Sequence, residues 1–466
     1  MLLFTSVYFV FLGFILALYW SASRWRTLAL GVVLFANYFF YAKWDLFYLF
    51  LIPAASTADY LIGLGLARYP NPGLRRALIA VSVTMNLGVL ASFKYMPFFL
   101  ENWAGITGSP PPQWHWTFPL GISFYVFQSL TYTIDLYRRD APPVTSYLTH
   151  LASVSFFPTT LSGPITRVAQ LAPQLDPSPE AQPRRLSPEA GGRALFLIGL
   201  GLIKKLLIAD YLGDNLVNRI FDLPKLYTGS EVLIGVYAYA LQLFYDFSGY
   251  TDIAIGSALL LGVKLPENFN QPYLAINIAD FWRRWHITLS NWLRDYLFFS
   301  LPGLRSRWKA FTYANLVLTM TLGGLWHGAS WNFVLWGLMH GVALVVCRAW
   351  LQRRWTMPVW LGRVLTFHFV CFAWIFFRAP DLASAGAMVE RIGSLTFSLA
   401  NISEPLAVVL AIAVAGHCIP RNWSAWCEAL YVRAPFYAQA TALALLVVGL
   451  QYIANTGAAP FIYTRF

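Results

Sequence analysis

The sequence predicts an all-α polytopic membrane protein, and three observations lead to that class. Hydrophobic residues make up 58% of the 466 residues and aromatic residues 17%, whereas charged residues make up only 12%, about half the charged fraction of a soluble domain. The apolar residues form long runs, and each crossing needs roughly 20 of them. The chain therefore has room for roughly ten or eleven transmembrane helices, which we expect to form one domain over residues 1–466.

The net charge of +12 fits the same class. The Lys and Arg residues lie in short clusters between apolar runs, as expected for loops that are retained in the cytoplasm. They do not alternate with aromatic residues over a broad surface as in a nucleic-acid-binding protein, so we expect no nucleic acid partner. Membrane lipids are expected partners instead.

The N-terminal part of the chain contains five expected spans. The first has no basic residues before it and no small-residue cleavage pattern, so we interpret it as a retained span. Arg24 and Arg26 follow it, which places that end in the cytoplasm and the N-terminus outside. A Pro- and Trp-rich stretch, Glu101–Phe118, is poor in basic residues and is expected to be external. The five spans are Leu2–Trp20, Leu28–Ala42, Leu46–Leu66, Ala77–Phe93 and Pro119–Leu136.

The middle of the chain is less regular. His150–Gly163 is apolar but too short to cross a bilayer, and Pro158 and Pro164 interrupt it, so we expect a re-entrant or interfacial piece. Arg167–Arg193 is the longest hydrophilic segment and is predicted to be a cytoplasmic loop.

Further spans are expected in the C-terminal part. Lys204 and Lys205 interrupt the first of these, so we expect that span to end early or these side chains to extend toward the membrane surface. No matched halves of the kind found in many transporters are visible. The spans are Ala194–Ala209, Leu233–Gly262, Thr312–Trp326, Trp331–Val346, Val359–Phe376, Pro405–Cys418 and Ala440–Ile453.

The strongest candidate for chemistry is His327, inside the apolar segment Thr319–Gly341. An ionisable side chain at membrane depth is costly, so its first interpretation is functional. Gly323, Gly324 and Gly328 flank it without an obvious packing reason, and glycine lets backbone or substrate approach closely. We predict a site built into a helix break.

A second histidine, His340, lies 13 residues beyond His327. On a continuous helix the two would be roughly 20 Å apart on different faces. We therefore expect His340 to lie outside the site.

The segment Asp280–Tyr296 predicts one amphipathic helix in the membrane interface. At about 100° per residue, six apolar residues form one stripe and the polar residues, Asn291 among them, cover the opposite side. His286 lies at the edge of the stripe, where its ring can point into the protein. A catalytic role and a purely structural, hydrogen-bonded role both remain open. The stripe consists of Trp282, Trp285, Leu289, Trp292, Leu293 and Tyr296.

A third segment, Leu243–Gly256, places Asp246, Tyr250 and Asp252 inside an apolar run. Intramembrane acids pair with a base or line a water-filled path. Structural hydrogen bonding between helices and a supporting role in catalysis are both open for Asp246.

Several common catalytic patterns are absent from the sequence. It has no Walker-type phosphate loop, G-x-S-x-G elbow, HExxH pattern or dinucleotide fingerprint. The four cysteines show no ligand spacing, so neither a disulfide framework nor a metal site is expected. The remaining chemistry is that of histidine as a general base, which removes a proton from a hydroxyl as it attacks an activated acyl group.

At this point five motifs can be read together. They are YDFSGYTDIAIG from Tyr245, NFNQPY at Asn268–Tyr273, DFWRRWHITLSNWLRDYLF from Asp280, GGLWHGASWNFVLWGLMHG at Gly323–Gly341, and FIYTRF at Phe461–Phe466. In this order they resemble the membrane-bound O-acyltransferases, specifically the bacterial branch that modifies alginate and teichoic acid. FIYTRF differs slightly from the sequence that is typical of the family at this position.

The resemblance implies a function and a site. It implies helices around a central tunnel through the membrane, with His327 as the catalytic residue and His286 as a second recurrent position near the cytoplasmic mouth. We add Asp246, Asn291, Trp326 and Tyr250 as supporting residues.

The resemblance also implies the substrates and partners. The expected reaction moves an acetyl group from a cytoplasmic thioester, acetyl-CoA, to an extracytoplasmic polysaccharide, with no bound cofactor, in the bacterial inner membrane. The chain lacks an esterase-like domain with a serine nucleophile, so a periplasmic acetyltransferase partner is expected.

Three alternatives stay open. One is D-alanyl transfer from a carrier protein to teichoic acid. Another is a proton-coupled transporter that uses His327 and Asp246 as a relay, although the absence of repeated halves argues against it. The third is a non-enzymatic scaffold of a polysaccharide export complex, in which His327 would be dispensable for polymer acetylation.

Overall fold

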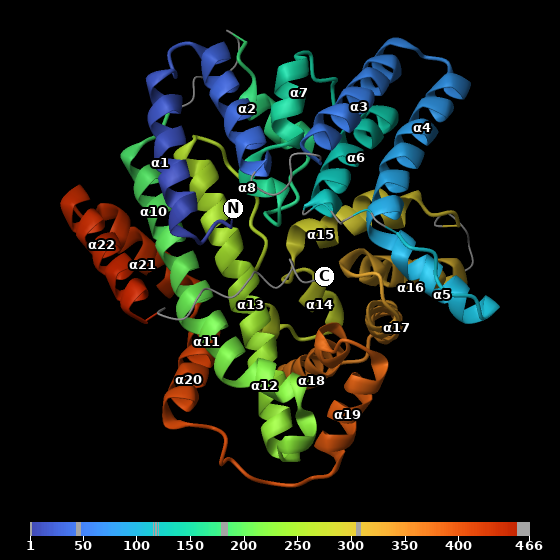
Figure 1. The fold of residues 1–466 in the computed structure, drawn as a ribbon, viewed down its shortest axis with the longest axis vertical. Coiled ribbons are helices and arrows are strands. Elements are labelled where there is room, and N and C mark those ends of the chain that lie inside the picture. Colours follow the sequence, from blue (N-terminus) through green and yellow to red (C-terminus); the bar gives the residue numbers. More distant parts are fainter. Residues whose placement is uncertain are drawn as a thin grey trace. The chain divides into compact units, whose positions relative to one another are not determined.

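A computed structural model describes residues 2–42, 48–114, 116, 119, 121–178, 185–303 and 309–453 (Figure 1). Helices joined by turns and loops make up these ranges, and no strand occurs within them. This confirms the all-α class. The FIYTRF motif at 461–466 lies outside the described residues.

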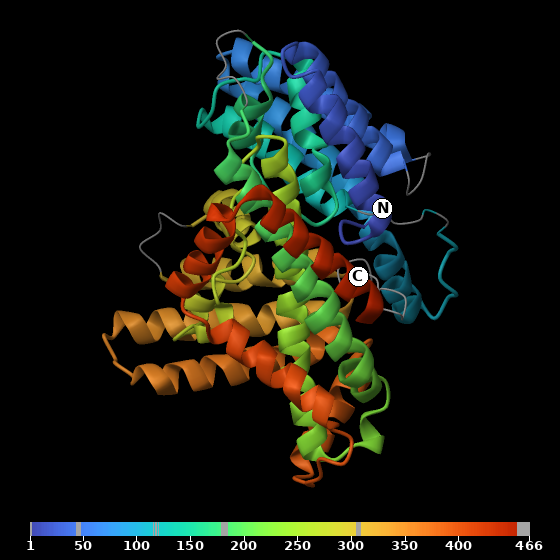
Figure 2. The ribbon, with the colours of Figure 1, turned by 90° about the vertical axis from the view of Figure 1, so that its left-hand side faces the viewer.

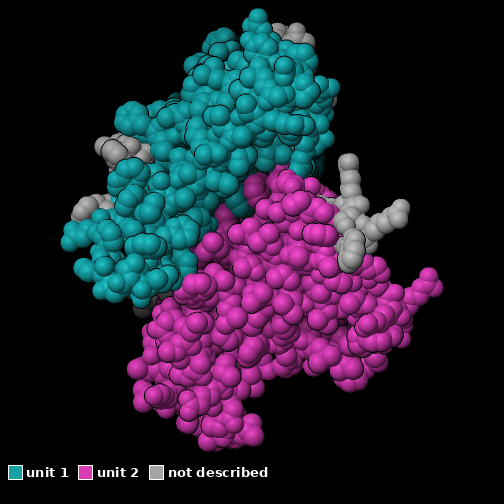
Figure 3. Space-filling model, turned by 90° about the vertical axis from the view of Figure 1, so that its right-hand side faces the viewer, with its two compact units in different colours: residues 1–198, 253–266 teal, residues 199–252, 267–466 magenta. Residues whose placement is uncertain are grey.

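The chain divides into two compact units, which Figure 3 colours separately. Unit 1 comprises residues 1–198 and 253–266, and unit 2 comprises residues 199–252 and 267–466. Two long helices contribute residues to both units: α10 (Pro188–Leu202) and α13 (Gly229–Leu260). The expectation of one domain over residues 1–466 stays a prediction.

Unit 1 is a helical bundle with short helices packed into its core. The segment expected to be re-entrant forms two short helices, α7 and α8, and both are almost entirely buried. The predicted loop Arg167–Arg193 is wrong in part, because α9 lies within it and buries Leu171 and Leu175. The elements are α1 (Ser6–Ser21), α2 (Arg26–Ala42), η1 (Tyr48–Phe50), α3 (Leu51–Arg68), α4 (Pro72–Leu90), η2 (Ala91–Tyr95), α5 (Met96–Thr107), α6 (Ile122–Arg138), α7 (Tyr147–Val154), α8 (Phe157–Thr160) and α9 (Val168–Leu175).

Unit 2 carries every residue that we expected in the site. Its helices α17 and α18 lie side by side as the orange pair in Figure 2. The elements that follow α10 are η3 (Ile203–Ala209), α11 (Asp210–Leu212), η4 (Gly213–Val217), α12 (Asn218–Asp222), η5 (Pro224–Leu226), η6 (Pro272–Leu274), α14 (Ile278–Trp282), α15 (Ile287–Trp292), η7 (Leu293–Leu297), η8 (Phe298–Ser300), α16 (Lys309–His327), α17 (Trp331–Gln352), α18 (Val359–Arg378), α19 (Leu382–Gly393), α20 (Glu404–Cys418), α21 (Arg421–Arg433) and α22 (Phe436–Ile453).

Few of the described helices are both long and apolar enough to span a bilayer alone. Three meet that criterion: Pro72–Thr107, Trp331–Gln352 and Val359–Arg378. Glu404–Cys418 and Arg421–Arg433 make a fourth if this pair, bent by 95°, counts as one span. The number of ten or eleven spans stays a prediction. The first of these helices extends through Glu101 as far as Thr107, and the external location of Glu101–Phe118 stays a prediction.

The glycines near His327 pack α16 against α17. A Cβ atom at Gly324 would overlap the carbonyl oxygen of Phe333 and lie 3.0 Å from the Gly337 Cα atom. A Cβ atom at Gly341 would lie 2.8 Å from the Val317 Cα atom. The statement that the glycines lack a packing reason was therefore wrong. They let two membrane helices approach backbone to backbone, as small residues do in helix pairs within lipid.

We expect Gly324→Ala to destabilise the protein by about 1–3 kcal/mol, because a methyl group at this position overpacks a backbone contact that cannot yield. The measurement is the unfolding midpoint of the purified chain in mixed micelles. Gly386→Ala on α19 is the matched control, because a Cβ atom there meets nothing within 4 Å. Equal midpoints for the two variants would contradict this account of the helix pair.

Candidate active site

His327 is the last residue of α16. The chain turns at residues 328–330 and α17 starts at Trp331, so the predicted helix break is confirmed. The imidazole is only 4% exposed. Its ring centroid lies 5.0 Å from that of Trp326, 5.2 Å from that of Trp336 and 5.2 Å from that of Phe377. Aromatic side chains from three helices therefore fix the position of this ring.

The turn after His327 also changes the place of His340. Because the chain reverses there, Trp336 contacts both rings, at 5.2 Å from His327 and 4.7 Å from His340 between centroids. The continuous helix on which their separation was predicted does not exist. His340 is fully buried and lies one indole ring away from His327.

The segment around His286 is not the single helix that we predicted. Helix α14 ends at Trp282 and α15 begins at Ile287. His286 lies between them with φ of +42°, in the left-handed region that few non-glycine residues adopt. The predicted stripe is nevertheless buried along its whole length. The break turns the His286 ring fully into the protein.

The motif Asn268–Tyr273 positions His286, a role that sequence reasoning did not assign to it. Ile287 donates from its backbone nitrogen to the carbonyl oxygen of Asn268 at 2.9 Å, and Asn270 donates to that of Arg284 at 2.9 Å. These two bonds hold the motif alongside the segment that breaks at His286. The Asn268 side chain then lies 3.1 Å from His286 Nδ1.

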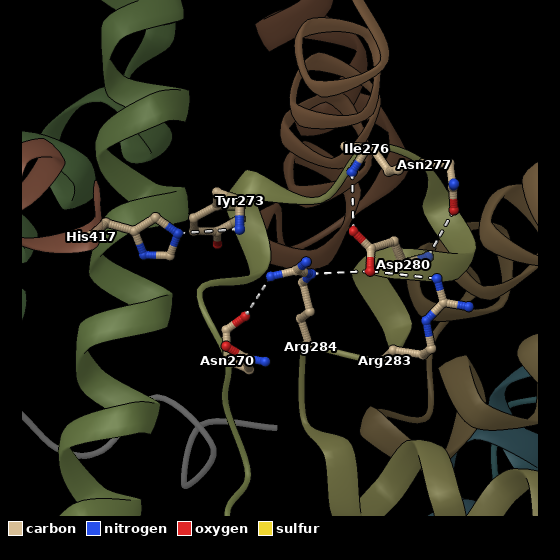
Figure 4. A network of polar contacts seen from close by, with 8 residues as sticks. All are labelled: Asn270, Tyr273, Ile276, Asn277, Asp280, Arg283, Arg284 and His417. Atoms are coloured by element: carbon tan, nitrogen blue, oxygen red, sulfur yellow. Dashed lines mark hydrogen bonds and ion pairs between the residues drawn. The ribbon is translucent and has the colours of Figure 1, made fainter. Parts of the chain in front are cut away.

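A polar network anchors the same two segments (Figure 4). Asp280 pairs with Arg284 at 3.0 Å and accepts from the backbone nitrogen of Ile276 at 3.2 Å. Burial alone would raise the pKa of the Asp280 carboxyl, but the hydrogen bonds from Arg284 and Ile276 outweigh it and hold that pKa below its usual value. At the C-terminal end of the motif Asn268–Tyr273, the backbone nitrogen of Tyr273 donates to His417 Nε2 at 3.2 Å.

Trp326 brings the two candidate histidines into one aromatic cluster. Its ring lies 5.0 Å from His327 and 6.4 Å from His286, between centroids. Phe247 of α13 packs edge-on against His286 at 4.7 Å. The structure therefore brings His327, His286 and Trp326 together in one aromatic cluster.

Comparison with known proteins identifies the family. The model of the membrane-bound O-acyltransferase family matches residues 79–380, which include all the residues of this cluster. The chain belongs to the membrane-bound O-acyltransferase family. It is a membrane protein and an acyltransferase.

Three relatives of this acyltransferase come from different bacteria. The probable alginate O-acetylase AlgI of Azotobacter vinelandii is 40% identical over 87% of this chain and 80% of its own length. The peptidoglycan O-acetyltransferase of Helicobacter pylori is 36% identical over 79% of this chain and 75% of its own length. The teichoic acid D-alanyltransferase of Bacillus subtilis is 32% identical over 62% of this chain and 76% of its own length.

The acyltransferase also buries a cluster of charges in unit 2. Lys205 Nζ lies 2.6 Å from Asp210 Oδ1 and 2.8 Å from Asp246 Oδ1, and Lys204 Nζ lies 2.6 Å from Asp252 Oδ2. Asp246 and Asp252 each pair with a lysine, which is one of the two possibilities left open for these acids. The alternative that both lysines extend to the surface was wrong for Lys205, which is 1% exposed.

The other two predicted support residues, Tyr250 and Asn291, are less closely connected to His286 and His327. Tyr250 is buried on α13, one helical turn after Asp246. Asn291 is half-buried on α15, and no hydrogen bond within the described residues joins it to His286 or His327. Across the described ranges, no three His, Cys, Asp or Glu side chains form a group that could hold a metal ion.

Proposed function

We propose that this acyltransferase moves an acetyl group from a cytoplasmic thioester, acetyl-CoA, to O-acetylate an extracytoplasmic polysaccharide. The proposal places the chain in the bacterial inner membrane, with several spans around a tunnel. A periplasmic acetyltransferase partner completes the transfer to the polymer. The acyltransferase uses its own side chains and needs no resident cofactor.

One observation carries the proposal: two buried imidazoles, His327 and His286, flank a single indole in unit 2. A neutral imidazole in a site that excludes water is suited to taking a proton from a hydroxyl group. The acetyl donor is supported by relatives named O-acetylase or O-acetyltransferase, which match 79–87% of the chain.

The proposed chemistry is acyl transfer with His327 as general base. His327 removes the proton from the acceptor hydroxyl as its oxygen attacks the thioester carbonyl. The carbon–sulfur bond then breaks, and the proton passes from the imidazole to the leaving thiolate. The products are an O-acetyl ester and free coenzyme A thiol, and the imidazole returns to its neutral form. His286 orients the reacting groups or shuttles protons.

D-alanyl transfer from a carrier protein is the second candidate, supported by the relative from Bacillus subtilis. Its match covers 62% of this chain, against 87% for the alginate relative. We therefore rank acetyl transfer first.

The test uses inverted membrane vesicles that contain the full chain, its polysaccharide and its periplasmic partner. Radiolabelled acetyl-CoA is added to the outside, which corresponds to the cytoplasmic face, and hydroxylamine-labile label on the polymer inside is counted. A parallel arm supplies D-alanine loaded on a carrier protein. We expect label only from acetyl-CoA. Label from the D-alanyl carrier alone would select the second candidate, and label from neither donor would refute both.

A further inference from the structure

We infer that Asn268 is a positioning residue that locks His286 in one tautomer, with the proton on Nδ1 and the lone pair on Nε2. His286 thus serves the reaction as a proton acceptor through Nε2. This inference rests on the proposed function for the reaction involved, but the tautomer itself follows from geometry alone.

The geometry concerns one oxygen atom, Oδ1 of Asn268. The backbone nitrogen of Thr288 lies 3.1 Å from it, the Thr288 hydroxyl oxygen 2.9 Å, and His286 Nδ1 3.1 Å. A backbone N–H group can only donate, so the Asn268 atom that faces it must be the carbonyl oxygen and not the amide nitrogen. The usual ambiguity in orienting an asparagine side chain does not arise here.

The tautomer of His286 follows from that assignment. A carbonyl oxygen only accepts, so Nδ1 of His286 must carry a proton in order to bond to it. In a neutral imidazole the other nitrogen, Nε2, then holds the lone pair. Full burial of the ring favours this neutral form over the imidazolium.

The backbone supports the same arrangement. The backbone bonds from Ile287 N to the Asn268 carbonyl oxygen and from Asn270 N to the Arg284 carbonyl oxygen hold the two segments in register. His286 itself has φ of +42°. A non-glycine residue keeps this strained conformation only where its surroundings enforce it, and such residues cluster at functional sites. Asn268 is 1% exposed, so water does not compete for its oxygen.

The first experiment reads the tautomer without any enzymatic activity. The full chain, with ¹⁵N in its histidine rings, is reconstituted in lipid and studied by solid-state NMR, in which protonated and lone-pair nitrogens give separate resonances. The His286→Asn variant, which keeps a polar group near the Nδ1 position, assigns the signals by their loss. We expect a protonated Nδ1 and a lone-pair Nε2 for His286. A protonated Nε2 would overturn the inference.

The second experiment measures acetyl transfer in the vesicles. Asn268→Leu removes the hydrogen-bond acceptor while keeping a similar side-chain volume. We expect acetyl transfer to fall by between about 10-fold and 10⁴-fold. The upper figure is the cost of a wrong histidine tautomer in a serine protease triad. Asn268→Asp keeps an acceptor for Nδ1–H and should recover most of that activity.

The pH profile separates this role from a merely structural one. A carboxylate beside Nδ1 favours the protonated ring, so a higher pH is needed to free Nε2. The acidic limb of activity in Asn268→Asp should therefore move to higher pH. An unmoved limb, or equal loss of activity in Asn268→Asp and Asn268→Leu, would refute the role of Asn268. Absence of transfer by the wild type would instead refute the proposed function and leave the NMR result to decide the tautomer.

Discussion

His327→Gln is expected to lower acetyl transfer by about 10² to 10⁴-fold, the contribution of a general base. Glutamine keeps the polarity and most of the volume of the side chain but cannot take up the proton. The ring contacts of His327 with Trp326, Trp336 and Phe377 involve one side chain at the end of α16, so we expect the fold to persist. The measurement is the number of acetyl groups per sugar in the exported polymer.

His368→Gln is the matched control for this prediction. His368 is exposed on α18, and its Nδ1 lies 2.7 Å from the Val364 carbonyl oxygen within the same helix. Transfer by this variant should equal that of the wild type. Normal polymer acetylation in His327→Gln would contradict the enzymatic role of His327 and would revive the scaffold alternative.

Lys205→Met is expected to cost about 3–5 kcal/mol of stability, because it leaves two carboxylates, Asp210 and Asp246, buried without their cation. The Asp246 side chain is 1% exposed and that of Asp210 is 12% exposed, so water does not replace the lost ammonium group. The measurement is the free energy of unfolding in mixed micelles, followed by tryptophan fluorescence.

Two further variants make this prediction specific. Replacing Lys205, Asp210 and Asp246 together by Met, Asn and Leu should recover much of the loss, because no charge is then left uncompensated. Arg421→Met breaks an ion pair whose side chains are 59% and 63% exposed, and should change stability by less than about 1 kcal/mol. A small loss of stability in Lys205→Met together with a large loss in Arg421→Met would contradict the assignment of Lys205 as the cation of a buried ion-pair cluster.

Periodicity and composition predicted the local features of this chain well. The apolar residues picked out around His286 by their angular spacing are all buried, although the single helix on which that spacing was counted is broken. The helix break after His327 was predicted from glycine and the cost of a buried histidine, and it is confirmed. Both arguments use only residues that are close in sequence.

The errors arose where contacts with other helices and segments decide the structure. His286 has a left-handed backbone and its ring lies against Asn268, a contact that no periodicity within 280–296 encodes. The packing role of Gly324 depends on how closely α17 approaches α16. Lys205 stays buried because Asp246, on another helix, neutralises it. The order of the motifs along the chain can indicate which segments are partners, but it does not give the distances and orientations between their residues.

The contact between α16 and α17 has a consequence for the route of substrates. The backbones of Gly341 and Val317, and of Gly324 and Phe333, lie against each other, so parting the two helices would break close backbone contacts. We therefore do not expect a lateral gate to open between α16 and α17. Under the proposed function, we expect the acyl donor and the hydroxyl acceptor to reach His327 by a route other than this seam, with little reorganisation of the ring when they arrive.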